Sequence, residues 1–191
     1  MLAHLDRLAA SAELIGAVNC VADSDGELVG ENTDGRGFVV SLQTIVDLIG
    51  RRIVLFGGGG AARAIAVESA LAGAASITIV NRSSARDAAL VELIRTRAPA
   101  SAELVAWNQR SEVPEDAGIV VNATSIGLLG AAQRRLDLGT DSLAPQMVVA
   151  DVIPNPARTA LLHDGQARGC TTLDGRGMLV NPDRHRAVDR G

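Results

Sequence analysis

The apolar residues of this chain gather in short runs that do not alternate with polar residues. The clearest of these runs are residues 53–56, 77–80, 119–121 and 147–152. Strands that are buried on both faces of a parallel sheet give this pattern, because neither face meets water. Helical patterns occupy residues 61–71 and 83–97, between the first three runs. The alternation of strand and helix predicts the α/β class, a Rossmann-like doubly wound parallel sheet with helices on both faces.

A hairpin and a helix are expected ahead of the first run. Residues 17–22 and 27–30 flank an Asp-Gly pair, which predicts a β-hairpin. Apolar residues from Phe38 to Ile49 follow a helical spacing and predict a helix with one buried face, directly after the segment 32–35.

The first residues of the chain have leucines at amphipathic spacing. We expect one helix over residues 1–13, and its lack of a capping signal suggests a chain cut from something longer. Such a helix exposes Leu2, Leu5 and Leu8, which favours aggregation or a homo-oligomer. The polar end, residues 182–191, is expected to be poorly ordered.

Composition excludes several classes of chemistry. The 191 residues carry a net charge of −4 and are 47% hydrophobic, which suits one globular domain with a real core. Lysine and tyrosine are absent, so a Walker-type phosphate loop, a Schiff-base lysine and a Tyr/Lys catalytic pair are ruled out. Scattered arginines and 2% aromatic residues argue against nucleic-acid and membrane partners.

The remaining composition predicts neither export nor a metal site. No leader with a basic start and an apolar core is present, so we expect a cytoplasmic location. Metal-ligand spacing is not found among the cysteines and histidines, which are Cys20, Cys170, His4, His163 and His185.

A glycine-rich segment follows the first apolar run directly. Residues 57–62 read Gly-Gly-Gly-Gly-Ala-Ala and match the spacing G-x-G-x-x-A. Gly57 permits a tight turn out of the strand, Gly59 permits close approach of a pyrophosphate, and Ala62 permits close helix packing. Free N–H groups at the start of the next helix suit phosphate oxygens. A ligand-free turn is the alternative, but the position between strand and helix favours a dinucleotide, with Gly57, Gly58, Gly59, Gly60 and Ala61 binding it.

The end of the second run indicates which dinucleotide is bound. NAD-binding units place an acidic residue there for the ribose 2′-hydroxyl, about 20 residues after the glycines. This chain has Asn81, Arg82 and Ser83 instead, and Arg86 follows one helical turn later. Arginine suits a 2′-phosphate, so the pattern favours NADP over NAD. The alternative is that both arginines are solvated residues at a helix start, where a cation is slightly unfavourable.

Several motifs in order resemble those of shikimate dehydrogenases. They are residues 14–19, 32–35, 57–62, 81–83, 122–127 and 174–180. The resemblance implies reversible reduction of 3-dehydroshikimate to shikimate with NADP(H), in aromatic amino acid biosynthesis. Residues 151–156 look somewhat like a sister group that uses quinate.

The resemblance also implies roles for single residues. Asn19 and Asp34 match positions that bind substrate hydroxyls, and Asp34 matches the acid that works with a catalytic lysine. The plainer alternatives are that Asn19 satisfies the hairpin and that Asp34 is the N-cap of a helix beginning near Gly35. Thr124 matches the loop that lines the cofactor, where a simple turn is the alternative, and Val152 and Gly175 match positions near the nicotinamide.

The chain also departs from the family pattern. It has neither the serine-rich binding motif nor the catalytic lysine, Asn181 and Pro182 replace a glutamine, and Pro154 replaces a tyrosine. We therefore expect a remnant of the substrate domain over 1–33, an NADP-binding Rossmann domain over 34–181 and an altered tail over 182–191. Three functions stay open: a dehydrogenase for shikimate or quinate with impaired turnover, a stand-alone NADP(H)-binding module, and a purely structural product.

Overall fold

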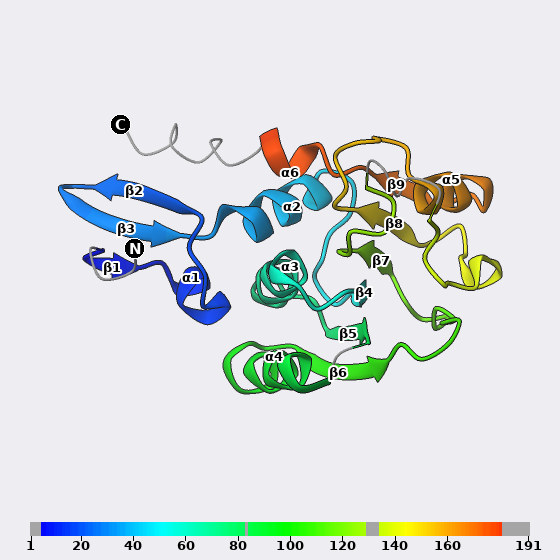
Figure 1. The fold of residues 1–191 in the computed structure, drawn as a ribbon, viewed down its shortest axis with the longest axis horizontal. Helices are drawn as coiled ribbons and strands as arrows, with labels where there is room; N and C mark the ends of the chain where they lie inside the picture. Colours follow the sequence, from blue (N-terminus) through cyan, green and yellow to red (C-terminus); the bar gives the residue numbers. More distant parts are fainter. Residues whose placement is uncertain (1–4, 83, 129–133, 181–191) are drawn as a thin grey trace.

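The computed structural model describes residues 5–82, 84–128 and 134–180, which form two separate sheets (Figure 1). The smaller sheet has the order β1-β3-β2 and is built from β1 (Arg7–Leu8), β2 (Cys20–Ser24) and β3 (Glu27–Glu31). Helix α1 (Ala10–Ile15) follows β1 and contacts helix α3 (Gly60–Leu71), which packs on the larger sheet. The small sheet thereby projects from one end of the molecule.

The larger sheet has six strands that all run parallel, in the order β6-β5-β4-β7-β8-β9. The strands are β4 (Arg52–Phe56), β5 (Ser76–Asn81), β6 (Ser101–Ala106), β7 (Ile119–Asn122), β8 (Val148–Asp151) and β9 (Thr171–Leu173). The four predicted strands are confirmed as the centre of this sheet. The two edge strands, β6 and β9, are only partly buried, so they lack the continuous apolar pattern that identified the others.

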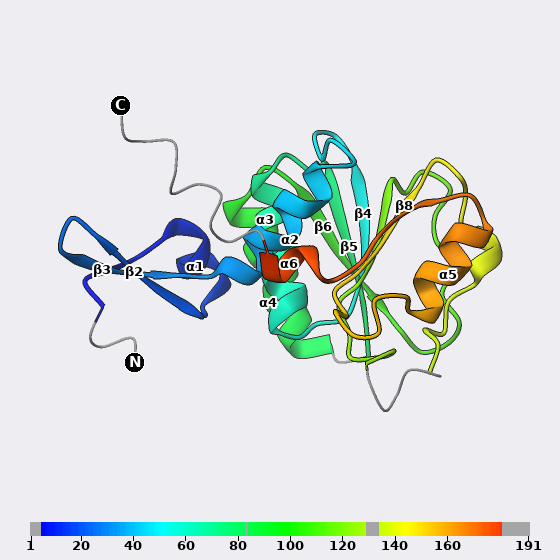
Figure 2. The same ribbon diagram turned by 90° about the horizontal axis from the view of Figure 1, so that it is seen from above.

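Helices cover both faces of the larger sheet (Figure 2). On one face lie α2 (Thr33–Gln43), α3 (Gly60–Leu71), α4 (Ser84–Arg97) and α6 (Gly177–Val180), and on the other lies α5 (Ala160–Ala167). A short 3-10 helix spans Thr140–Ser142. Alternate residues of β4 enter different cores, with Leu55 packing under α3 and Phe56 packing on the α5 side. The fold is a doubly wound Rossmann-like α/β sheet, as the apolar pattern predicted.

The hairpin is confirmed, and its turn has the geometry that the Asp-Gly pair favours. Asp25 and Gly26 have φ values of 57° and 89°, and Ser24 pairs with Glu27 across the turn. Both central residues of a tight hairpin turn need positive φ, which aspartate and glycine adopt readily. Residues 17–19 precede β2 rather than belonging to it.

The expected helix over residues 1–13 is wrong. Residues 7–8 form a strand parallel to β3, and the helix begins only at Ala10. The reason is a contact distant in sequence, because Leu5 and Leu8 pack where Gly30 has no side chain. A Cβ at Gly30 would lie 2.6 Å and 2.8 Å from their methyl groups. Both leucines are half-buried rather than exposed, while Leu2 lies outside the described residues.

The helix after residue 32 is confirmed but is shorter than its apolar spacing predicted. It ends at Gln43, and Ile45 and Ile49 are 41% and 72% exposed. The expectation for residues 182–191 falls outside the described residues. Within the described part of the chain, no helix combines the length and apolar character needed to cross a bilayer.

Candidate functional site

The carboxyl ends of the parallel strands meet at one edge of the larger sheet. The chain order reverses between β4 and β7, which lie side by side. Ligands of open α/β sheets bind in the crevice outside such a reversal, because adjacent loops diverge to opposite faces there. The loops that follow β4, β5, β7 and β8 form the candidate site.

The glycine loop after β4 packs closely on its neighbours at its start and is open at its end. Gly57 has φ +114°, and a Cβ there would lie 2.8 Å from the carbonyl oxygen of Ala123. A Cβ at Gly58 would collide with Asp87 and Asn81. Among the described residues, and apart from their neighbours along the chain, no heavy atom lies within 4 Å of a Cβ built at Gly59 or Gly60. The first two glycines are therefore needed by the fold, and the last two leave space for a ligand.

A pocket of about 330 Å³ borders this loop and the start of α3. Gly59 is the N-cap of α3 and has no side chain to cap it, so the first N–H groups of the helix have no partner within the helix. Arg63 in the same turn donates hydrogen bonds to the carbonyl oxygens of Leu14 and Ile15. The guanidinium of Arg63 thus holds the end of α1 beside the pocket, and it links the part of the chain that carries the small sheet to the part that carries the larger sheet.

The residues at the end of β5 are held by partners that the sequence did not reveal. The amide nitrogen of Asn81 donates to the carboxylate of Asp87 at 2.6 Å, and Asp87 is only 1% exposed. The exposed guanidinium of Arg82 lies 5.2 Å from the ring centre of Trp107. That indole is held by an edge-to-face contact with Phe56, at 5.4 Å between ring centres. Ser83 and the side chain of Arg86 lie outside the described residues.

The loops after β7 and β8 are joined through a buried carboxylate. Asp151 is 0% exposed and accepts hydrogen bonds from Thr159 at 2.7 Å and from the amide of Asn122 at 3.1 Å. Burial raises the pKa of Asp151, and these hydrogen bonds oppose part of the rise. Thr124 donates its hydroxyl to the amide oxygen of Asn122 at 2.7 Å.

The expected nicotinamide neighbours Val152 and Gly175 lie in contact. A Cβ at Gly175 would be 2.3 Å from the carbonyl oxygen of Val152, so only glycine allows this approach. Beside Gly175, Arg176 binds Asp174 through two nitrogens and lowers the pKa of that carboxyl. The chain after β9 is thus folded against the loop that follows β8.

The structure places the predicted substrate residues at the start of α2. The amide oxygen of Asn19 accepts from the N–H of Thr33 at 2.9 Å and from its hydroxyl at 3.3 Å. Asp34 is exposed in the first turn of this helix. The alternative that Asp34 caps a helix beginning near Gly35 is wrong, because the helix begins at Thr33 and its N-cap is Asn32. The side chain of Asn19 reaches the start of the helix, while its backbone N–H donates to the carbonyl oxygen of Glu31 at the end of the hairpin.

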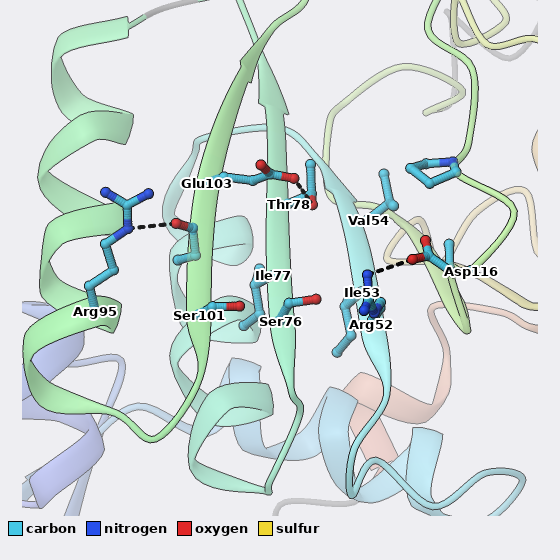
Figure 3. A pocket seen from close by; sticks show the side chains of 13 residues that line it. Arg52, Ile53, Val54, Ser76, Ile77, Thr78, Arg95, Ser101, Glu103 and Asp116 are labelled. Carbon is cyan, nitrogen blue, oxygen red and sulfur yellow. Dashed lines mark hydrogen bonds and ion pairs between the residues drawn. The ribbon is translucent and has the colours of Figure 1, made fainter.

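A groove of about 350 Å³ lies elsewhere, on the sheet face at the opposite ends of β4, β5 and β6 (Figure 3). Its charged groups are already paired within the protein. Arg52 pairs with Asp116, and Glu103 accepts from Thr78 at 2.7 Å. The groove contains the first residues of the strands rather than the last, so it is not the ligand crevice. Among the described residues, no three acidic, histidine or cysteine side chains gather as metal ligands do.

Sequence reasoning missed four of these residues. Asp87 and Trp107 carry no motif, and their roles come only from the packing of α4 and the segment after β6 against the strand ends. Asp151 was placed in a buried strand and at the start of the quinate-like segment 151–156, but it was given no role of its own. Thr159 had a readable signal, because threonine two residues before a Leu-Leu pair is a good N-cap, and its hydroxyl accepts from Leu162 at 3.4 Å.

A glycine loop between the first strand and the first helix of a doubly wound parallel sheet defines the class of Rossmann-fold, dinucleotide-binding-type proteins. Comparison with known proteins narrows this class. No protein-family model matches the sequence of this chain. A curated shikimate dehydrogenase (NADP(+)) from Rhodospirillum rubrum is 40% identical over 193 residues, covering 96% of this chain and 65% of that protein.

Solved structures agree with this relation. The ligand-free 5-ketofructose reductase of Gluconobacter sp. strain CHM43 is 54% identical, with a TM-score of 0.91 over 95% of this chain and 65% of its own. The shikimate 5-dehydrogenase of Listeria monocytogenes, solved with shikimate and NAD, is 34% identical, with a TM-score of 0.87 over the same shares. This chain belongs to the shikimate dehydrogenase family. It spans slightly less than two thirds of the length of these relatives.

Proposed function

We propose that the chain binds NADP(H) at the carboxyl edge of the larger sheet. The open space at Gly59 and Gly60 and the uncapped start of α3 fit a pyrophosphate. Arg82, stacked beside Trp107 at the end of β5, fits the 2′-phosphate of the adenosine ribose. The glycine loop at the strand reversal is the observation that carries this proposal.

The other cofactor contacts follow from the same placement. Gly57, Gly58 and Ala61 shape the phosphate loop, and Asn81 with Ser83 and Arg86 completes the adenosine end. Thr124, Val152 and Gly175 line the nicotinamide end, where the loops after β7, β8 and β9 converge. Bound NADPH supplies the hydride, and the protein orients it.

The proposed activity is the reversible reduction of 3-dehydroshikimate to shikimate. Asp34 lies in the first turn of α2, and the side chain of Asn19 accepts hydrogen bonds from Thr33 at the start of that helix. In this proposal both residues bind substrate hydroxyl groups. Asp34 is the group that holds the proton of the reacting hydroxyl, because hydride loss from a C–OH carbon requires loss of that proton. The named activity of the curated relatives supports this proposal.

The cofactor proposal is tested by titration of the purified chain with NADPH and, separately, with NADH. We expect NADPH to change the fluorescence of Trp107, which lies against Arg82, and to raise the melting temperature. NADH is expected to bind more weakly. If neither nucleotide changes either signal, the chain does not bind a dinucleotide at this edge.

The similarity to 5-ketofructose reductase supports a second substrate. That protein is 54% identical to this chain, against 40% for the shikimate dehydrogenase compared above. In addition, the use of shikimate as substrate does not explain why Pro154 and Asn181 depart from the shikimate dehydrogenase pattern. We propose 5-ketofructose as the alternative substrate, and quinate as a further alternative. Parallel assays of NADPH oxidation with 3-dehydroshikimate and 5-ketofructose, and of NADP⁺ reduction with quinate, distinguish the three.

A stand-alone NADP(H)-binding role without turnover is the remaining candidate, and the absence of lysine from the sequence favours it over full catalysis.

We also propose that the chain is divided into a substrate-domain remnant over 1–33, an NADP-binding domain over 34–181 and a tail over 182–191. A homo-oligomeric state and a cytoplasmic location are proposed as well. Light scattering on the purified chain tests the oligomer, and a monomer at high concentration would contradict it.

A further inference from the structure

One carboxylate holds both loops at the proposed nicotinamide end. Asp151 is the last residue of β8, and it pairs in register with Asn122, the last residue of β7. It is fully buried, and its two oxygens accept hydrogen bonds from a hydroxyl, a side-chain amide and a backbone N–H. No guanidinium or imidazole is among these partners.

On one side, this carboxylate decides how the amide of Asn122 is turned. An ionised carboxylate only accepts hydrogen bonds, so the amide nitrogen must face it. The amide oxygen then faces the next loop and accepts the N–H and the hydroxyl of Thr124, at 3.0 Å and 2.7 Å. Thr124 in turn accepts the N–H of Ile126 at 3.0 Å. The orientation of Thr124 is therefore set through Asn122 by Asp151.

On the other side, the same carboxylate holds the start of the loop after β8. It accepts the N–H of Ile153 at 3.0 Å, which fixes the backbone on both sides of Val152. It also accepts the hydroxyl of Thr159, the N-cap of α5, at 2.7 Å. The loop from 152 to 158 is thus tied at both ends to one buried group.

We propose that Asp151 is a positioning residue for the nicotinamide half of the cofactor, acting through Asn122 on Thr124 and through Ile153 on Val152. This inference rests on the proposed function, in which the loops after β7 and β8 contact the nicotinamide half of NADP(H). Burying a carboxylate without a cationic partner is unfavourable, and burial raises the pKa of Asp151 accordingly. A group used only for packing has no need of a charge here.

The test separates the two halves of the cofactor. Adenosine 2′,5′-bisphosphate probes the adenosine end alone, and NADPH probes both ends, each by calorimetry on the full chain. Asp151→Asn places an amide nitrogen beside donors that need an acceptor, so it disturbs the orientation of Asn122. We expect NADPH to bind about tenfold more weakly, as loss of one or two hydrogen bonds predicts, with the bisphosphate unchanged.

Asp116→Asn is the matched control, because Asp116 is exposed at the opposite end of the strands and pairs with Arg52. It should leave both affinities unchanged. Equal weakening of NADPH and the bisphosphate in Asp151→Asn, or no change in either, would overturn the inference. If the unaltered chain binds neither probe, the proposed function itself fails and this inference fails with it.

A second pair of variants decides the matter if Asp151→Asn does not fold. Thr159→Val removes the hydroxyl that donates to Asp151, and Thr159→Ser keeps it. The valine variant should weaken NADPH several-fold without affecting the bisphosphate, and the serine variant should restore the affinity. If the valine and serine variants bind NADPH equally, the network from Asp151 does not position the nicotinamide end.

Discussion

At the scale of single residues, the candidate site is made of side chains that orient one another. Asn81 is turned by Asp87, Arg82 rests on Trp107, and Asn122 is turned by Asp151. In each pair, the orienting partner is buried: Asp87, Trp107 and Asp151 are 1%, 6% and 0% exposed. Buried partners lose few conformations to ligand binding, so the groups that face a ligand are already in place.

The first prediction concerns Arg82. Replacing Arg82 with alanine removes a charge-assisted contact to the 2′-phosphate, so NADPH should bind about tenfold more weakly or worse. NADH lacks this phosphate, so its affinity should change little. Calorimetry is the measurement, because Trp107 lies against Arg82 and its fluorescence changes with the substitution itself.

The control for this prediction is Arg110→Ala, which removes an exposed arginine that pairs with Glu112. It should change neither affinity. Equal weakening of NADPH and NADH in Arg82→Ala would mean that Arg82 does not contact the 2′-phosphate.

The second prediction concerns the pH dependence of stability. Because burial raises the pKa of Asp151 in the folded chain, the protonated form favours folding. The stability that Asp151 contributes relative to Asp151→Asn is therefore greatest below its unfolded pKa of about 3.9 and is lost as pH rises through the folded pKa. Urea unfolding of both proteins across this range measures the difference. A difference that grows with pH would contradict the raised pKa.

At the scale of elements, the helices on one face approach one another through glycine. Gly35 in α2 meets the backbone of α3, where a Cβ would lie 2.4 Å from the carbonyl oxygen of Ala64. Gly37 meets the carbonyl oxygen of Met178 in α6 in the same way, at 2.8 Å. This close packing places Asp34, in the first turn of α2, beside the helix that follows the glycine loop.

The third prediction tests this crossing. Alanine at Gly35 gains about 1 kcal/mol in helix propensity, but the clash with α3 costs about 1–3 kcal/mol or more because backbone cannot move aside. Gly35→Ala should therefore unfold at lower urea concentration than the unaltered chain. Unchanged or increased stability would mean that α2 and α3 shift apart at no cost.

Gly59→Ala is the matched comparison. Its Cβ would enter open space at an extended backbone position, so the urea midpoint should stay nearly unchanged. The same Cβ stands where the pyrophosphate is proposed to lie, and NADPH affinity should fall by about tenfold or more. The two variants thus separate a glycine needed for folding from one needed for the ligand.

At the scale of the whole molecule, the chain combines a complete parallel sheet with a small sheet that projects from it. The contact between them runs through α1, whose last carbonyl groups are held by Arg63. The proposed substrate residues lie at this junction, since Asn19 precedes β2 and binds the start of α2. Most residues of the proposed cofactor half belong to the larger sheet and its loops, and the proposed substrate half consists of Asn19 and Asp34.

The fourth prediction follows from that imbalance. The 191-residue chain should bind NADP(H) but reduce 3-dehydroshikimate or 5-ketofructose very slowly. Asp34 has no lysine to work with, since the sequence contains none, and loss of one acid–base group lowers a rate by about 10²–10⁴. The measurement is the loss of NADPH absorbance as the nucleotide is oxidised, with Asp34→Asn as the comparison.

Turnover in the ordinary range of enzymes, about 1–10³ per second, would contradict this prediction. It would mean that an arginine or another chain supplies the proton-transferring group. Equal slow rates in Asp34→Asn and the unaltered chain would show that Asp34 does not take part in the residual reaction.

The central strands, the helices between them and the place of the glycine loop could all be predicted from the sequence. These features depend on local rules: a strand buried on both faces is continuously apolar, and a tight strand-to-helix turn needs glycine. The hairpin at Asp25 and Gly26 is local in the same sense. Such patterns occupy neighbouring residues, so they can be recognised without knowing the fold.

Contacts between residues that are distant along the chain could not be predicted in this way. Residues 7 and 8 form a strand rather than part of a helix, because Gly30, more than 20 residues later, leaves room for the side chains of Leu5 and Leu8. The contacts of Arg82 with Trp107 and of Asn122 with Asp151 likewise depend on which strands become neighbours. No short-range pattern encodes strand order, so the partners that orient the candidate site emerge only once the sheet has formed.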